Sequence, residues 1–457
     1  MGFAPNFLPY EKARKYLAVY SLIRNFVPEM AGIYIHIPFC KSRCIYCAFY
    51  STTAFDLRQR YVDALCREMV LREERREERG ERREELKSRN EERKTRNEEK
   101  EIETIYLGGG TPSQLTPAQL RQIFIYINKV YNISPSSLLL PPSSTKEITI
   151  ECNPDDVTAD FAEALQQLPV NRVSMGAQTF DDRRLQFLHR RHSAAQVATA
   201  VRRLRQAGID NISIDLMYGF PGETLSDWQH DIDAALALDV EHISAYCLMI
   251  EEGTPLYKQM LKVHTVDGSL FVVSDETTQR EPSPLSEELE RQMYELLIDR
   301  LTAAGYEHYE ISNFARAGRR SRHNSSYWTD VPYIGLGAAA HSYTPPRTSP
   351  DGKGIRSYNV ADIHQYIEAI ERGELPSEQE VIDGDTRYND RLTVALRTCE
   401  GLCLDELSAR HRDYLLRTAR RYVDDGLLVL SNHHLRLSRK GLFVSDMVLA
   451  DLMLVDD

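Results

Sequence analysis

The sequence predicts an α/β protein built on a parallel sheet or barrel. Six short β-rich runs recur along the chain, and amphipathic helical stretches lie between several of them. The runs occupy residues 32–38, 104–110, 147–154, 171–178, 211–221 and 242–251. Cysteines, a glycine triplet and polar side chains stand where these runs end. Barrels of this class gather their chemistry at the C-terminal ends of the strands, so these residues predict a site there.

Two of the intervening stretches show the helical period clearly. Residues 61–71 place four apolar side chains on one face, namely Val62, Leu65, Cys66 and Met69. Residues 194–207 repeat the pattern with Val197, Val201 and Leu204. We therefore expect Cys66 in the core and the second helix to stop at Gly208.

Composition narrows the class of protein. The chain has 457 residues, enough for more than one domain, and its 56 basic against 68 acidic residues give a net charge of −12. That charge disfavours nucleic-acid or anionic-membrane partners. The 8 cysteines lack the dense pattern of a secreted disulfide scaffold. No signal peptide and no membrane-length apolar run stands out, so we expect a cytoplasmic protein without stable membrane insertion.

Residues 1–30 form a preamble with two open interpretations. In the first interpretation, translation starts at Met30 and the preamble is dispensable. In the second, Tyr10 to Phe26 form a helix that packs on the rest of the protein. The barrel is expected over residues 31–260.

Three segments interrupt the expected barrel and its continuation. Residues 72–103 are a charged insertion, either an exposed helix with paired charges or a disordered segment. Residues 134–146 read as a loop, and residues 262–285 as an inserted hairpin or flexible loop. A connecting region is expected over residues 261–382.

Cys40, Cys44 and Cys47 form a C-x3-C-x2-C group. Three thiols are a poor disulfide framework and are one ligand short of a closed zinc site. One interpretation is zinc with His36 as the fourth ligand. The other is a cubane iron–sulfur cluster that leaves one iron open to a small molecule. No second cysteine pair has zinc spacing, and "CEGLC" (399–403) reads as packing in a helix-like region.

These residues resemble a known superfamily. The C-x3-C-x2-C spacing with Tyr46 before the last cysteine, followed by "GGGTP" (108–112), is similar to radical S-adenosylmethionine proteins. "YIHIPFC", "ECNP", "MGAQTF", "IDLMYGFPGET", "HNSSYW" and "YIGLGAAAHSY" resemble one branch of it. That branch comprises oxygen-independent coproporphyrinogen III oxidase and its heme-chaperone relatives. The resemblance runs from about Tyr34 to the C-terminus, apart from the insertions.

The resemblance implies a partial (β/α)6 TIM-like radical SAM barrel with a [4Fe-4S] cluster on the three cysteines. It implies that S-adenosylmethionine binds the open iron and that an electron donor drives its cleavage to methionine and a 5′-deoxyadenosyl radical. The implied contacts to this cofactor are Tyr34, Tyr46, Gly109, Gly110, Thr111, Glu151, Gln178, Arg190 and Asp215. Arg191 is the neighbouring alternative to Arg190.

Two features distinguish the members of the branch. The oxidase pattern has a fourth cysteine two residues after the third, where this chain has Phe49. "HNSSYW" (323–328) resembles the H-N-x-x-Y-W motif of the heme chaperones, which implies that His323 binds heme. A structural, hydrogen-bonded histidine is the alternative for His323, and His341 is a second candidate ligand.

Residues 383–457 predict a small α+β domain that resembles a winged helix, with helices, a β-hairpin and a closing helix. His433 and His434 at the hairpin turn are expected on the surface. Because the chain is acidic and the second helix is needed for packing, DNA binding is not expected.

The sequence therefore predicts a radical SAM protein that binds a cluster, S-adenosylmethionine and heme and passes heme to acceptor proteins. Whether it is also an enzyme stays open. The alternative function is oxidative decarboxylation of coproporphyrinogen III to protoporphyrinogen IX. A third possibility, from a different class, is a structural zinc protein.

Overall fold

The computed structural model describes residues 31–87, 102–131, 133, 146–262, 285–346 and 353–455. The preamble, including the two interpretations of its role, lies outside these residues. So do residues 88–101 of the charged insertion, nearly all of the 134–146 loop and nearly all of the 262–285 segment. Among the described residues, no helix is long and apolar enough to cross a membrane.

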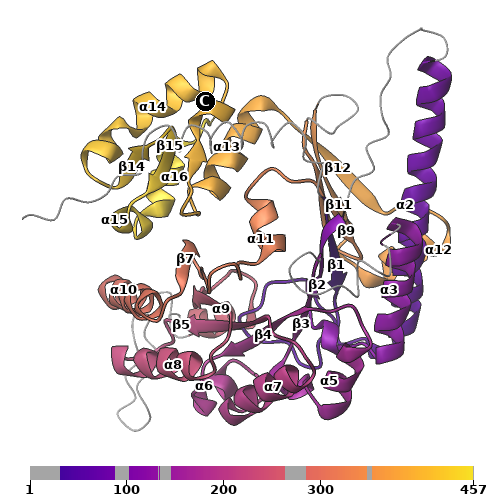
Figure 1. Cartoon of the computed structure of the whole chain (residues 1–457), viewed down its shortest axis with the longest axis horizontal. Helices are drawn as coiled ribbons and strands as arrows, with labels where there is room; N and C mark the ends of the chain where they lie inside the picture. Colours follow the sequence, from indigo (N-terminus) through magenta and orange to yellow (C-terminus); the bar gives the residue numbers. More distant parts are fainter. Residues whose placement is uncertain are drawn as a thin grey trace, which may run out of the picture.

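Six parallel strands form the centre of the structure, paired in chain order (Figure 1). They are β1 (Ala31–Ile37), β2 (Ile102–Gly109), β3 (Glu147–Cys152), β4 (Arg172–Gln178), β5 (Ile212–Tyr218) and β6 (His242–Cys247). The six β-rich runs of the sequence are thus confirmed as strands. Because the pairing is parallel, all six C-terminal ends lie at one edge of the sheet.

Helices connect these strands and cover the outer face of the sheet. They are α2 (Arg58–Lys87), α3 (Pro117–Tyr131), α5 (Ala159–Gln166), α6 (Asp182–Phe187), α7 (Ala194–Gln206), α8 (Leu225–Ala237) and α9 (Pro255–Lys262). Short 3-10 turns lie at Phe55–Leu57, Pro112–Gln114, Pro154–Asp156 and Leu404–Glu406. Cys66 is buried in the core, as expected, and α7 ends just before Gly208, whose φ is +84°.

The charged insertion begins inside α2. The helix continues through Lys87, so residues 72–87 are helical, and Figure 1 shows this part projecting beyond the body. Arg76 and Glu73 form an ion pair at 3.3 Å on this segment, as expected for an exposed helix with paired charges.

The sheet does not close into a barrel, because other strands join both of its edges. Its full order is β12-β11-β10-β9-β1-β2-β3-β4-β5-β6-β8-β7. The added strands are β7 (Glu307–Glu310), β8 (Asn313–Ala315), β9 (Tyr333–Leu336), β10 (His341–Thr344), β11 (Gly354–Asn359) and β12 (Ser377–Ile382). Helices α10 (Glu287–Ala303), α11 (Arg322–Tyr327) and α12 (Ile363–Glu371) accompany them. The boundaries expected at 260 and 382 stay predictions.

The C-terminal part has its own three-stranded sheet, order β13-β15-β14, and its own apolar cluster. Its elements are α13 (Gly384–Ala395), β13 (Leu402–Cys403), α14 (Ala409–Asp424), β14 (Leu428–Ser431), β15 (His434–Leu437), α15 (Arg439–Leu442) and α16 (Ser445–Leu452). The hairpin turn has positive φ at Asn432 and His433, the geometry of a tight two-residue turn. Of the two histidines expected on the surface, His433 is exposed and His434 is half-buried.

The interpretation of "CEGLC" as packing in a helix is wrong for its first cysteine. Helix α13 ends at Ala395, and Cys399 lies in the following loop with its side chain exposed. Its sulfur accepts a hydrogen bond from Arg320 at 3.4 Å. Cys403 is half-buried in β13. The helical period fails here because Gly401 adopts a φ of +74° and turns the chain into the strand.

A fully buried carboxylate joins the added strands to the parallel sheet. Glu68 of α2 is 0% exposed and forms an ion pair with Arg72 at 2.7 Å. It also accepts hydrogen bonds from Gly337 N at 2.8 Å, Asn359 Nδ2 at 2.8 Å and Tyr366 Oη at 2.6 Å. One side chain therefore satisfies donors from the β9–β10 connection, β11 and α12.

Replacing Glu68 with Ala should lower the free energy of unfolding by ~3–5 kcal/mol, since it leaves several buried donors without a partner. Chemical unfolding followed by circular dichroism measures this. The control is Glu371→Ala, which breaks an exposed pair with Arg60 and should leave the unfolding midpoint unchanged. Equal effects of the two substitutions would contradict the role of Glu68.

Candidate cluster and S-adenosylmethionine site

The cysteines lie on a closed loop that follows β1. Cys40 N donates to Thr52 O at 2.9 Å, and Thr52 N donates to Pro38 O at 2.7 Å. These bonds join the two ends of the loop at the edge where the parallel strands end. The three thiols are therefore held above the mouth of the sheet.

One apolar residue anchors the middle of this loop. Ile45 is 2% exposed and packs in a small cluster of Leu188, Met217, Phe220, Leu248, Leu256 and Met260. Its carbonyl accepts from Leu256 N at 2.9 Å, and its N–H donates to Leu188 O at 3.4 Å. With Ile45 fixed, both of its neighbours, Cys44 and Tyr46, line the adjacent cavity.

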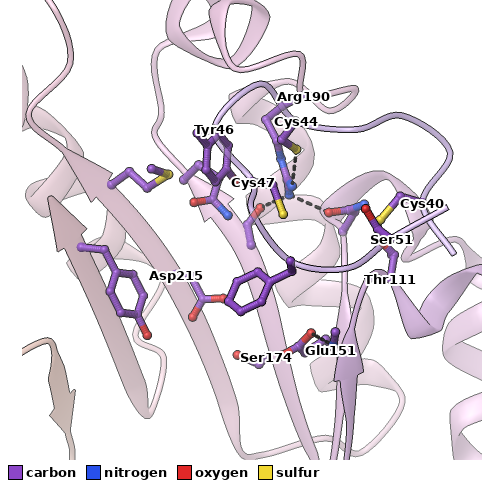
Figure 2. Close-up of a pocket in the computed structure, with 18 of the residues that line it drawn as sticks. Cys40, Cys44, Tyr46, Cys47, Ser51, Thr111, Glu151, Ser174, Arg190 and Asp215 are labelled. Atoms are coloured by element: carbon purple, nitrogen blue, oxygen red, sulfur yellow. Dashed lines mark hydrogen bonds between the residues drawn. The ribbon is translucent and has the colours of Figure 1, made fainter. Parts of the chain in front are cut away.

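A cavity of about 560 Å³ lies beneath the loop, between the strand ends (Figure 2). All three cysteines line it. So do eight of the predicted cofactor contacts, namely Tyr46, Gly109, Gly110, Thr111, Glu151, Gln178, Arg190 and Asp215. The structure thus brings eleven sequence-predicted residues to one cavity, drawn from the loop after β1 and from β2 through β5 with the loops that follow them.

Arg190 lies beside the cysteine loop. Its guanidinium donates to Cys44 Sγ at 3.6 Å, and to Asn153 Oδ1 and Gly176 O at 2.6 Å each (Figure 2). Arg191 also lines the cavity, but its guanidinium pairs with Asp155 at 2.8 Å and Asp156 at 3.1 Å. Of the two neighbours, Arg190 is therefore the one whose guanidinium forms no close ion pair with a described carboxylate and can pair with a ligand's carboxylate.

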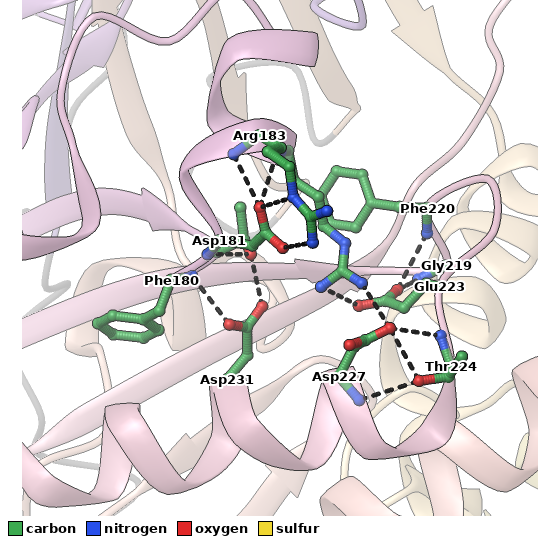
Figure 3. Close-up of polar contacts among 11 residues, drawn as sticks. Phe180, Asp181, Arg183, Gly219, Phe220, Glu223, Thr224, Asp227 and Asp231 are labelled. Carbon is green, nitrogen blue, oxygen red and sulfur yellow. Dashed lines mark hydrogen bonds and ion pairs between the residues drawn. The ribbon is translucent and has the colours of Figure 1, made fainter. Parts of the chain in front are cut away.

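An ionic network holds the helix that precedes Arg190. Arg184 of α6 pairs with Glu223 at 3.3 Å and Asp227 at 3.0 Å. Glu223, which is 2% exposed, also accepts from the N–H groups of Gly219 at 2.6 Å and Phe220 at 3.0 Å (Figure 3). The network fixes α6 against the β5–α8 connection, and with it the loop that carries Arg190.

Two carboxylates lie inside the cavity. Glu151 accepts from Tyr106 Oη at 2.7 Å and from Gly109 N at 3.1 Å. Burial raises the pKa of Glu151 to about 7 and that of Asp215 to about 6. The Arg172 guanidinium acts against burial and lowers the pKa of both groups. Carboxylates in such surroundings are suited to accept from an ammonium group or ribose hydroxyls.

The glycine loop is required by the fold as well as by any ligand. Gly109 has a φ of +102°, and a Cβ there would lie 2.4 Å from the His36 ring. A Cβ on Gly110 would lie 2.7 Å from the carbonyl oxygen of Ile37. The loop therefore lies directly against the end of β1, next to the cysteines.

The donor set fits an iron–sulfur cluster. Among the described residues no three His, Cys, Asp or Glu side chains converge as a single metal ion requires. A cubane differs, because each thiolate binds a different iron atom. Burial raises the pKa of Cys47 to about 11 and also raises that of Cys40, which hydrogen-bonds Thr111 Oγ1 at 3.4 Å. Metal binding must therefore displace protons from these thiols.

His36 is not available as the fourth ligand of a zinc site. Both ring nitrogens of His36 are in use, Nδ1 with Tyr34 Oη at 3.1 Å and Nε2 with Tyr50 O at 3.0 Å. Tyr34 itself does not line the cavity but stacks on Tyr106, with ring centroids 6.3 Å apart. Its contact with the cofactor stays a prediction.

His323 lies away from the cysteines, near the N-terminal ends of the strands. Its ring is 1% exposed, and Nδ1 bonds Thr104 Oγ1 at 2.8 Å while Nε2 bonds Tyr327 Oη at 2.9 Å. Burial lowers its pKa to about 3, so the ring is neutral. These contacts match the structural alternative, and heme ligation by His323 stays a prediction.

Sequence reasoning missed other polar residues that line the cavity. These are Tyr106, Asn153, Arg172, Ser174, Ser244, Tyr246 and Asn324. The signal was available in β4, because residues 172, 174, 176 and 178 alternate with buried apolar ones and all line the cavity.

Replacing Cys40, Cys44 or Cys47 with Ala should each abolish the cluster, because two thiolates cannot hold a cubane. Iron content and visible absorbance after anaerobic reconstitution measure this. Cys399→Ala is the control and should keep full iron, since that thiol is exposed and distant in the chain. Full iron in Cys44→Ala would refute the assignment.

Affinity for S-adenosylmethionine should rise with pH from 6 to 8, because Glu151 with a pKa of about 7 must ionise to accept the ligand's ammonium group. Below pH 7 the dissociation constant should increase roughly tenfold per pH unit. Isothermal titration of the reconstituted protein measures this. Glu151→Gln should remove the pH dependence, and an unchanged profile would exclude this residue from the site.

Comparisons with known proteins agree with this geometry. The radical SAM superfamily model matches residues 34–235, and the HemN C-terminal domain model matches residues 382–444. The heme chaperone HemW of Bacillus subtilis is 35% identical over 82% of this chain and 85% of its own. The heme chaperone HemW of Mycobacterium tuberculosis H37Rv is 29% identical over 92% of this chain and 94% of its own.

A solved structure extends the likeness to the fold. Coproporphyrinogen III oxidase (HemN) from Escherichia coli superposes with a TM-score of 0.67 at 18% identity, covering 95% of this chain and 93% of that one. At that identity the likeness concerns the fold alone. Sequence and structure together place the chain in the radical SAM superfamily, where it belongs to the HemW heme chaperone family.

Proposed function

We propose that this protein is a cytoplasmic heme chaperone that binds a [4Fe-4S] cluster, S-adenosylmethionine and heme, and passes heme to acceptor proteins. The observation that carries the proposal is the single cavity lined by three cysteines and eight predicted cofactor contacts. Family membership at 35% identity to a named heme chaperone supports the heme part. An electron donor is a further proposed partner, and the net charge of −12 argues against nucleic acid.

The proposed division of labour follows the cavity. Cys40, Cys44 and Cys47 hold the cluster, which with its bound cofactor supplies one-electron chemistry. Arg190 pairs with the carboxylate of S-adenosylmethionine, and Glu151 and Asp215 accept from its amino group or ribose hydroxyls. Thr111, beside Cys40, fixes the loop against the glycine segment.

Phe49 favours the chaperone over the oxidase. It stands where the oxidase pattern has a fourth cysteine, and its side chain is 71% exposed at the mouth of the cavity. Tyr246 and Met249, which also line the cavity, are 43% and 63% exposed. An exposed apolar rim of this kind suits contact with a hydrophobic macrocycle or an acceptor protein.

His323 is the proposed heme ligand, and its surroundings set a condition on that role. Its Nε2 is held by Tyr327 Oη at 2.9 Å, so ligation requires this bond to open. Both residues belong to the six-residue helix α11, so the Tyr327 side chain must rotate away from the imidazole before Nε2 can bind iron. His341, which is exposed on β10, is the alternative ligand and needs no such change.

The protein should bind heme in a stoichiometric complex and show no turnover of coproporphyrinogen III. His323→Ala should weaken heme binding while the cluster remains, since the two sites use different ligands. Soret absorbance and chromatography of porphyrin products, both under anaerobic conditions, measure this.

His341→Ala is the matched variant for that experiment. If His341→Ala loses heme binding and His323→Ala keeps it, His341 is the heme ligand. Formation of protoporphyrinogen IX by the wild-type protein, supplied with cluster, cofactor and reductant, would overturn the chaperone proposal in favour of the oxidase.

A further inference from the structure

Arg172 is a buried guanidinium whose charge lowers the pKa of Glu151 and Asp215 but which has no hydrogen-bond partner among the described residues. It is 1% exposed and forms no hydrogen bond or ion pair with any described residue, and its Nε is fully buried. Its side chain nevertheless lines the cavity. A buried N–H group is costly unless it donates a hydrogen bond, so an arginine that lines a cavity in this state points to an acceptor supplied by a ligand.

The position of Arg172 along β4 places it at the bottom of the cavity. Arg172, Ser174, Gly176 and Gln178 follow one another on the inner face of the strand. At about 3.3 Å per residue, Arg172 lies roughly 20 Å from Gln178, which is at the strand end with the cysteines. The predicted S-adenosylmethionine contacts on the neighbouring strands lie closer to the cysteines than Arg172 does. In the strand register, Glu151 lies opposite Ser174 and Asp215 lies opposite Gly176.

A second unsatisfied polar atom lies at the same level. Thr149 of β3 pairs in register with Arg172, is 0% exposed, and its hydroxyl has no hydrogen-bond partner in the described part of the chain. Polar atoms left without partners in an otherwise well-bonded interior mark places where a ligand completes the bonding.

The motif segment contributes to the same end of the cavity. Asn324, the second residue of "HNSSYW", lines the cavity together with Arg172. Glu147, at the start of β3, holds the beginning of α11 through bonds to the N–H groups of Arg322 at 3.0 Å and His323 at 2.9 Å. Helix α11 is therefore fixed at the N-terminal ends of the strands, where an amide side chain can reach a ligand.

We propose that Arg172, assisted by Asn324, binds the carboxylate of a second ligand at the floor of the cavity, beneath the S-adenosylmethionine contacts. A guanidinium binds a carboxylate through two parallel hydrogen bonds, and an amide adds a donor. Two sources fit this chemistry, a propionate of heme or the carboxylate of a free organic acid. The first source rests on the proposed function, and the second does not.

The test compares the reconstituted wild-type protein with Arg172→Met. The probes are heme, heme dimethyl ester and succinate, titrated by Soret absorbance or calorimetry. If a propionate is bound, heme should bind wild type about tenfold more tightly than the ester, and Arg172→Met should remove that difference. If a free acid is bound, succinate should bind the wild-type protein and not Arg172→Met. Heme and heme dimethyl ester should then bind the wild-type protein with the same affinity.

A thermal melt separates recognition from a structural role. Arg172→Met should change the melting temperature little, because Arg172 forms no hydrogen bond and no close ion pair with any described residue. The control is Arg184→Met, which breaks two ion pairs and should lower the melting temperature.

Equal affinities of wild type and Arg172→Met for heme and for succinate would overturn the proposal. So would a melting temperature that falls as far as in Arg184→Met. Absence of any heme binding by the wild type would instead refute the proposed function, while a succinate difference between the two proteins would still support the floor site.

Discussion

The parallel pairing of β1 with both β2 and β9 is the constraint on which the site depends. It directs the end of β1 to the same edge as the ends of β2 through β6. The cysteine loop therefore opens over residues far along the chain, such as Asp215, which follows Cys40 by 175 positions. The same pairing aligns the starts of these strands, where α11 and His323 lie. The cysteines thus lie at the C-terminal ends of the strands and the "HNSSYW" segment lies at their N-terminal ends, with the polar cavity between them.

The two faces of the strands divide the physical work. Outward residues of β4, such as Val173 and Met175, pack under the helices and stabilise the sheet by burial. Inward residues are polar or small and leave a cavity that holds both carboxylates and guanidinium groups. Burial raises the pKa of Glu151 and Asp215 toward neutrality, while Arg172 acts in the opposite direction. Opposite charges kept apart in a shielded space are suited to a ligand that carries both signs.

Local patterns predicted most of the parallel sheet and most of the cofactor cavity. Short β-rich runs predicted the strands, the helical period predicted α7, and cysteine spacing with strand-end glycines predicted where the cavity lies. Long-range effects escaped this reasoning. The addition of β9 beside β1 depends on pairing across about 300 residues, and the role of Glu68 appears only once three distant segments surround it. Likewise, the state of Arg172 and the bonding of His323 depend on tertiary neighbours that no spacing reveals.

We propose that three thiolates hold a cubane whose open iron faces the cavity lined by Arg190, Glu151 and Asp215. Electron paramagnetic resonance of the reduced cluster, recorded with and without S-adenosylmethionine, tests it most directly. Ligand binding at the open iron should change the spectrum in the wild-type protein, and Glu151→Gln with Asp215→Asn should reduce the change at equal ligand concentration. A spectrum that S-adenosylmethionine leaves unaltered would contradict the account.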